Sequence, residues 1–209
     1  MKANVTRFRT LALGLVQMKQ FVTAPKLLWT GAPIERFGGL RPREIWGNWL
    51  IAAVCSVGRE QELSLVTDPD GPNGSDGIIW DPATEVGWHM EHIMLPVSRE
   101  GDTRSNDERI IDAVNKKQGK GQAAYAKGKI LVILNESATN ERWHPTAVAR
   151  NIPKNDFDDI WVVGLHSYVD GAWTFGVTQL SLNAETGQAP IFHVRINSEF
   201  TAWAVTQVQ

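Results

Sequence analysis

The chain has 209 residues, of which 43% are apolar and 21% are charged, and its formal net charge is −2. This composition excludes an intrinsically disordered chain, and the single cysteine excludes an intrachain disulfide. The small net charge conceals four blocks along the sequence: +6 in residues 1–60, −9 in 61–115, +6 in 116–154 and −5 in 155–209. An acidic block between two basic blocks suits a metal site flanked by phosphate-binding charge, although ordinary solvated surfaces would give the same totals.

The N-terminal stretch contains an apolar run that Gln17 and Lys19 interrupt. The run is too short for a membrane span or a signal peptide. We therefore expect a soluble, cytoplasmic protein without a membrane segment. One domain is expected over residues 1–209, with a core over about residues 40–181, an N-terminal helical extension and a C-terminal strand.

Residues 41–58 give the clearest helix signal in the sequence. Pro42 suits the first helical turn, and Gly58 is a plausible stop. Between them runs an apolar stripe at helical spacing, formed by Ile45, Trp49, Ala52 and Ala53.

Short strands are predicted after this helix. Residues 61–68 read as a strand, 69–74 as a loop, and 76–81 and 87–95 as two strands joined by a turn. The two joined strands predict a hairpin.

Helices and strands alternate in the second half of the chain. The predicted elements are a helix over 107–127, a strand over 129–136, a short helix over 143–152, a hairpin over 159–181 with its turn at Asp170-Gly171, and a strand over 191–197. Together with the first half, this order predicts an α/β fold with a mixed central β-sheet flanked by helices.

Two carboxylates interrupt the apolar hairpin. Asp76 precedes the run Ile78–Trp80, and Glu91 stands in a strand where it shares a face with Ile93. A hairpin would bring the two carboxylates side by side, where they repel each other, and a Mg²⁺ or Mn²⁺ ion would remove that repulsion. The same repulsion predicts that Glu91→Ala leaves stability unchanged or raises it in metal-free buffer.

This arrangement resembles the PD-(D/E)XK nuclease superfamily, whose motif is an Asp on one strand, a turn, and then Asp or Glu, any residue and Lys on the next strand. Here the motif would read Asp76 followed by Glu91-His92-Ile93. The resemblance implies a restriction-endonuclease-like fold, metal ligation by Asp76 and Glu91, and a further acidic ligand at Glu44. It also assigns the helix 107–127 and the strand 129–136 to the helix and fourth core strand of that fold.

The motif lysine is missing, because Ile93 occupies its position. In several branches of the superfamily the following helix supplies a substitute. That resemblance nominates Lys117 for orienting the attacking water, with Gln118 next to it, although Lys117 could equally be a surface lysine. His89, on the same face as Glu91, is another candidate for handling the water.

The resulting hypothesis is a metal-dependent nuclease that hydrolyses phosphodiester bonds in nucleic acid, with DNA as the expected substrate. The alternative is an inactive nuclease-like scaffold that binds nucleic acid or protein, and a homodimer or a protein partner is possible in either case. A zinc site formed by His89 and His92 is disfavoured, since strand alternation puts the two rings on opposite faces.

Overall fold

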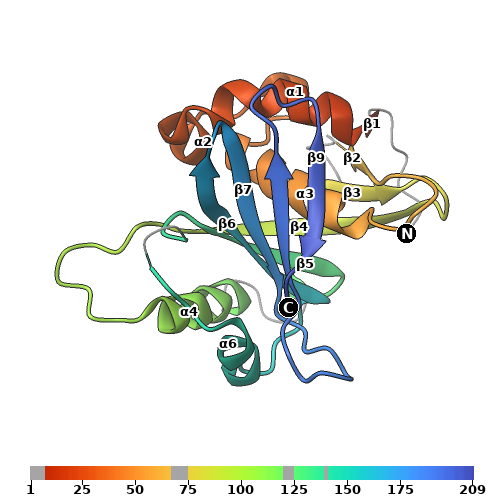
Figure 1. Ribbon diagram of the computed structural model, residues 1–209. Helices are drawn as coiled ribbons and strands as arrows, with labels where there is room; N and C mark the ends of the chain where they lie inside the picture. Colours follow the sequence, from red (N-terminus) through yellow and green to blue (C-terminus); the bar gives the residue numbers. More distant parts are fainter. Residues whose placement is uncertain (1–7, 67–74, 120–124, 139–140) are drawn as a thin grey trace.

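A computed structural model describes residues 8–66, 75–119, 125–138 and 141–209 of the chain (Figure 1). The described part forms a sheet of nine strands that lie side by side in the order of the sequence. They are β1 (Phe8–Arg9), β2 (Ser64–Val66), β3 (Ile78–Asp81), β4 (Val86–Leu95), β5 (Lys129–Asn135), β6 (Asp159–Val169), β7 (Ala172–Gln179), β8 (Ile191–Ile196) and β9 (Trp203–Gln207). The pairs β4–β5 and β5–β6 are parallel and the others antiparallel, which confirms the predicted mixed sheet.

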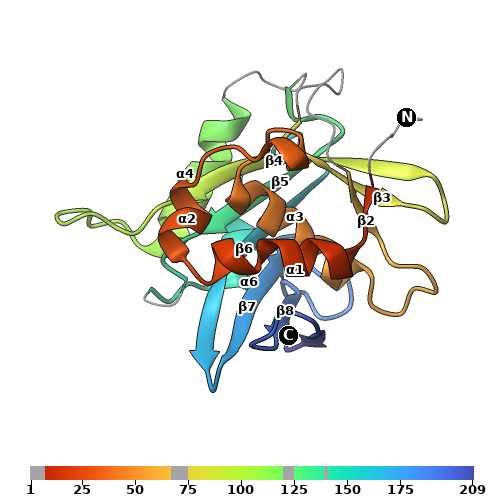
Figure 2. The same cartoon turned by 90° about the horizontal axis from the view of Figure 1, so that it is seen from above.

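Helices cover both faces of the sheet, as Figures 1 and 2 show from two directions. One face carries α1 (Leu11–Val22), α2 (Pro25–Thr30) and α3 (Pro42–Cys55), and a short 3-10 helix, Glu35–Phe37, links α2 to α3. The other face carries α4 (Asn106–Gln118) and α6 (Pro145–Asn151). No helix in the described part of the chain is long and apolar enough to cross a membrane.

The helix α3 forms where the sequence predicts a helix, and it is buried along most of its length. Pro42 occupies its first turn, and the backbone N–H of Arg41 donates to Glu44 Oε2 at 2.8 Å, which completes a helix cap. The whole predicted stripe is buried, and the indole of Trp49 donates to the Leu11 carbonyl at 2.8 Å. This hydrogen bond joins α1 to α3 inside the larger core.

Strand alternation decides which side chains of β4 and β5 face each helical layer. Met90 and Val132 pack with α1 and α3, whereas Leu131 and Ile133 pack with α4. Glu91 is paired in register with Leu131 and therefore faces the α4 side.

Several predicted boundaries are wrong, and two strands were not predicted. The strand expected over 76–81 begins at Ile78, so Asp76 precedes it, and the helix expected over 41–58 ends at Cys55. The strand expected over 61–68 is only Ser64–Val66, and the loop expected over 69–74 lies outside the described residues. The helix expected over 107–127 ends at Gln118, because Gly119, a poor helix former, is its C-cap. The hairpin over 159–181 is confirmed, with positive φ angles at its two turn residues, whereas β1 and β9 were not predicted.

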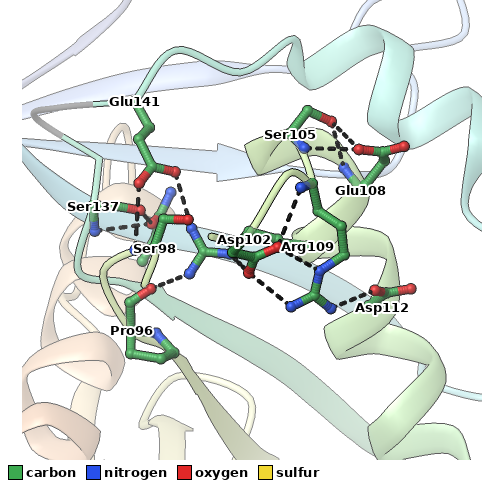
Figure 3. A network of polar contacts seen from close by, with 11 residues as sticks. Pro96, Ser98, Asp102, Ser105, Glu108, Arg109, Asp112, Ser137 and Glu141 are labelled. Carbon is green, nitrogen blue, oxygen red and sulfur yellow. Dashed lines mark hydrogen bonds and ion pairs between the residues drawn. The ribbon is translucent and has the colours of Figure 1, made fainter. Parts of the chain in front are cut away.

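A buried arginine holds together the two loops that follow β4 and β5 (Figure 3). Arg109, on α4, donates to Glu141 Oε2 at 2.9 Å and to the carbonyl of Pro96. Its Nε also lies 3.9 Å from Asp102 Oδ2, and the Ser98 N–H donates to Glu141 at 3.4 Å. These contacts fix both loops against the start of α4.

Candidate active site

Asp76 is held in place by an irregular start of β3. Its N–H donates to the Met90 carbonyl at 2.8 Å, and the Met90 N–H donates to the carbonyl of Gly77 at 2.9 Å. Asp76 and Gly77, just before β3, thus oppose the single residue Met90 of β4, and Gly77 adopts a φ of +115°. From α3, the buried amide of Asn48 donates to the Asp76 carbonyl at 3.1 Å, so the helix and the hairpin together position Asp76.

We expect Gly77→Ala to lower the free energy of unfolding by about 2–4 kcal/mol. Its Cβ would lie 2.4 Å from Nδ2 of Asn48, which would have to leave the Asp76 carbonyl. Gly58 is a matched control, because its φ of +75° is also positive but a Cβ there meets nothing within 4 Å. Gly58→Ala should cost about 1–2 kcal/mol. Urea denaturation measures both, and equal losses would show that Asn48 does not clamp Asp76.

The carboxylate of Asp76 lies beside His92. The His92 backbone N–H donates to Asp76 Oδ2 at 2.8 Å, and Nδ1 of the His92 ring lies 3.7 Å from the same oxygen. Burial alone would raise the pKa of Asp76, but His92 and the positive charge of Lys117 outweigh burial and lower that pKa to about 2. Asp76 therefore carries a negative charge at every pH at which the protein is expected to work.

This lowered pKa predicts how Asp76 affects stability in acid. Its ordinary pKa is 3.8 and its folded value is about 2, so the stability that Asp76 contributes is present above pH 3.8 and is lost as the pH falls toward 2. Since the side chain is partly exposed, we expect a contribution of about 1–2 kcal/mol. Urea titrations of wild type and Asp76→Asn should show a smaller loss of stability between these pH values in the variant. Identical pH profiles would contradict the lowered pKa.

Glu91 lies in a buried cluster of charged and aromatic groups. Its Oε1 accepts a hydrogen bond from Lys117 Nζ, and its Oε2 lies 3.5 Å from Lys129 Nζ. Lys117 also donates to the hydroxyl of Tyr125 at 3.4 Å, and the ammonium of Lys129 lies 4.4 Å from the centre of the Tyr125 ring. We call Glu91, Lys117, Tyr125 and Lys129 the Glu91 cluster. Burial and the charges of Glu91 and Asp76 raise the pKa of Tyr125, so its hydroxyl stays protonated.

The structure places two of the predicted site residues beside Glu91. Lys117 lies on the inward face of α4 and contacts Glu91 directly, as the sequence indicated. His89 is paired in register with Lys129, on the same face as Glu91, and its Nδ1 lies 3.2 Å from the Ser75 hydroxyl. Burial and the charge of Lys129 lower the pKa of His89. Catalytic roles for Lys117 and His89 remain predictions.

The other two predicted residues have structural partners elsewhere. Glu44 caps α3 through the Arg41 N–H and lies 3.8 Å from Nη2 of Arg43, so its observed role is at the start of its own helix. The Gln118 amide donates to the carboxylate of Asp156 and accepts from its N–H at 3.3 Å. Gln118 thus links α4 to the segment before β6.

Sequence reasoning missed three groups at this site. Lys129 is the first residue of β5 and lies on the same face as Leu131. Because a buried lysine needs a partner of opposite charge, its position in an apolar strand was a signal that a carboxylate lies nearby. His92 was expected on the face opposite Glu91, where the structure puts its ring, but its backbone contact with Asp76 was not foreseen. Tyr125 is adjacent to Lys117 only in space, and no sequence pattern indicated it.

No group of three or more His, Cys, Asp or Glu side chains in the described residues is arranged to hold a metal ion. A Mg²⁺ ion commonly takes only one or two protein carboxylates and completes its shell with water and substrate oxygens. Asp76 and Glu91 are chemically suited to such a site, but each currently contacts different partners, His92 for one and the lysines for the other. Comparison of the chain with family models, curated proteins and solved structures found no match.

Proposed function

We propose that the protein is a metal-dependent nuclease that hydrolyses phosphodiester bonds in DNA, and that its fold is restriction-endonuclease-like. The order α3, β2, β3, β4, α4, β5 supports this proposal, since it matches the order of elements that the resemblance implies. Glu91 lies on β4, and Asp76 lies two residues before β3, the antiparallel neighbour of β4, which pairs in parallel with β5 on its other side. A cytoplasmic location remains part of the proposal.

The observation that carries the proposal is the convergence of two ammonium groups on Glu91. The motif lysine is absent at Ile93, yet Lys117 and Lys129 reach Glu91 from α4 and β5. Lys117 also influences the carboxylate of Asp76, because its charge contributes to the lowered pKa of that group. Lys117 thus contacts one acid directly and acts on the other through its charge, which supports a site of two acids and a basic group.

In this proposal Asp76 and Glu91 would hold Mg²⁺ or Mn²⁺, and the ion would supply an activated water and stabilise the leaving oxygen. Lys117 would orient the attacking water or contact a phosphate oxygen. His89 is the second candidate for receiving a proton, because the lowered pKa of His89 favours its neutral form. Glu44 could join as a ligand only by giving up its cap of α3.

A non-catalytic scaffold that binds nucleic acid or a protein partner is the second candidate, and one observation favours it. Two buried ammonium groups already neutralise Glu91, so an arriving metal ion must displace at least one of them. A cluster of this kind also stabilises a fold without any chemistry. In this reading the replacement of the motif lysine by Ile93 marks the loss of activity.

Cleavage of single- and double-stranded DNA, with RNA as a further substrate, separates the two candidates. We expect wild type to cleave DNA with Mg²⁺ or Mn²⁺ and to stop when the ions are chelated. Asp76→Asn removes a ligand charge at a partly exposed site, and we expect at least about a 10²-fold loss of rate. Absence of cleavage by wild type, with DNA binding retained, would favour the scaffold. Equal cleavage by Asp76→Asn would contradict the proposed site.

A further inference from the structure

A second cleft, of about 610 Å³, lies at the carboxyl end of β5. It opens on the sheet face that α4 and α6 cover, and its floor is the place where Gly164 of β6 pairs with Gly176 of β7. A Cβ on Gly176 would meet only one atom within 4 Å, the carbonyl oxygen of Gly164, so the space above Gly176 is open, whereas a Cβ on Gly164 would lie 2.5 Å from Cβ of Ala138. The volume falls in the range of small-molecule sites, and ligands of open α/β sheets bind beyond the carboxyl ends of parallel strands.

The polar groups left free in this cleft are hydrogen-bond donors or imidazoles. Asn135 is fully buried at the end of β5, and its Oδ1 accepts from the Ser137 N–H and hydroxyl, but its Nδ2 has no partner. The rings of His166 and His193 lie 4.4 Å apart, centre to centre, and neither has a hydrogen bond within the described residues. At the rim, the exposed guanidinium of Arg142 likewise has no ion pair in that part of the chain.

The carboxylate that lines the cleft, Glu141, and the one that contacts His144 at its edge, Asp107, are already occupied. Glu141 is bound by Arg109 at 2.9 Å, as Figure 3 shows. Asp107 accepts from the His144 N–H at 2.7 Å and lies 3.0 Å from Nδ1 of the same residue. With acceptors neutralised and donors free, the electrostatic character of the cleft favours an anion.

The walls of the cleft are fixed in advance. The contacts of Arg109 and Asp107 hold the segment 141–144 against α4 on one side. On the other side, the hydroxyl of Thr146 accepts from the Ala189 N–H and from the Gln209 amide, both at 3.1 Å. A ligand would therefore lose little free energy in ordering the protein.

We propose that this cleft binds an organic phosphate of about the size of a nucleoside monophosphate. The phosphate lies between Arg142 and the His166–His193 pair and accepts a hydrogen bond from the Asn135 amide. Donors from three parts of the chain, namely the end of β5, the segment before α6 and the β6 and β8 strands, suit a group with three oxygens. The organic part packs against apolar walls formed by Trp143, Ile191 and Val208.

This inference is independent of the proposed nuclease site. Lys129 of the Glu91 cluster starts β5 and Asn135 ends it, so the two places are about 20 Å apart along the strand. A chain that lacked all nuclease activity could still bind a phosphate here.

Titration calorimetry with adenosine 5′-monophosphate, adenosine and inorganic phosphate tests the proposal. We expect the monophosphate to bind tightest, inorganic phosphate more weakly and adenosine weakest. His193→Gln and Arg142→Gln should each reduce affinity for the monophosphate by about tenfold or more, since each removes a charge-assisted contact. Arg99→Gln, a loss of the same charge outside this cleft, should change nothing.

Three results would overturn the proposal. They are the absence of binding by the monophosphate and by inorganic phosphate at millimolar concentrations, equal binding by adenosine, and unchanged binding in both His193→Gln and Arg142→Gln. Because these two residues lie at the surface of the cleft, thermal melts should show both variants folded like wild type.

Discussion

Glu91→Ala is expected to lower the free energy of unfolding by about 3–5 kcal/mol, because it leaves two buried ammonium groups without a counter-charge. Lys117 and Lys129 both contact Glu91, and the side chains of all three are less than one-tenth exposed. This reverses the expectation from sequence that removing Glu91 leaves stability unchanged or raises it. That expectation counted the repulsion between Asp76 and Glu91 but not the two lysines.

Urea denaturation at neutral pH measures this loss, and two further variants show its cause. Adding Lys117→Met to Glu91→Ala should recover part of the loss, because one unpaired buried charge disappears. Glu199→Ala breaks the exposed pair with Lys19, 3.4 Å apart, and should cost no more than about 1 kcal/mol. A loss for Glu91→Ala as small as that for Glu199→Ala would contradict the buried ion pairs.

The second large effect concerns catalysis. Lys117→Met should reduce metal-dependent DNA cleavage by about 10²–10⁴-fold if Lys117 replaces the missing motif lysine, since a positioned proton-transfer group is worth that much. Stability should stay close to wild type, because Lys129 still neutralises Glu91 and Met fills a similar volume.

Lys116→Met is the matched control for this experiment. Lys116 is the preceding residue of α4 and is exposed, so the change removes the same charge without reaching Glu91. We expect Lys116→Met to reduce cleavage only slightly, because it removes one surface charge near the DNA. This reduction should be smaller at higher salt, which screens such charges. Equal losses in the two variants would assign Lys117 a role in general electrostatics and not in the reaction.

The part of the site that follows from local periodicity was predictable. Strand alternation put Glu91 on the face of Ile93, and helical spacing put Lys117 on the inward face of α4. The partners that come from elsewhere in the chain were not. Lys129 and Tyr125 reach Glu91 through tertiary packing, and no spacing in the sequence specifies that contact.

Glu44 shows how one residue type can indicate two roles. A glutamate at the third helical position is a capping signal, and the structure uses it in that way. The capping signal was missed because the N-cap residue is Arg41, not the Ser or Thr of the usual pattern. The sequence also predicted too long a helix at Gln118. The residues on both sides of Gly119 fit a helical pattern, but glycine is a poor helix former and the helix ends there.

The most direct test of the proposed metal site is a crystal of the protein soaked in Mn²⁺ and measured for anomalous scattering. The proposal predicts a peak about 2 Å from an oxygen of Asp76 and an oxygen of Glu91, with Lys117 Nζ moved off Glu91. In Asp76→Asn the peak should disappear. A map with no peak at these carboxylates, and with Lys117 and Lys129 still bound to Glu91, would contradict the metal site and leave the cluster as a structural ion pair.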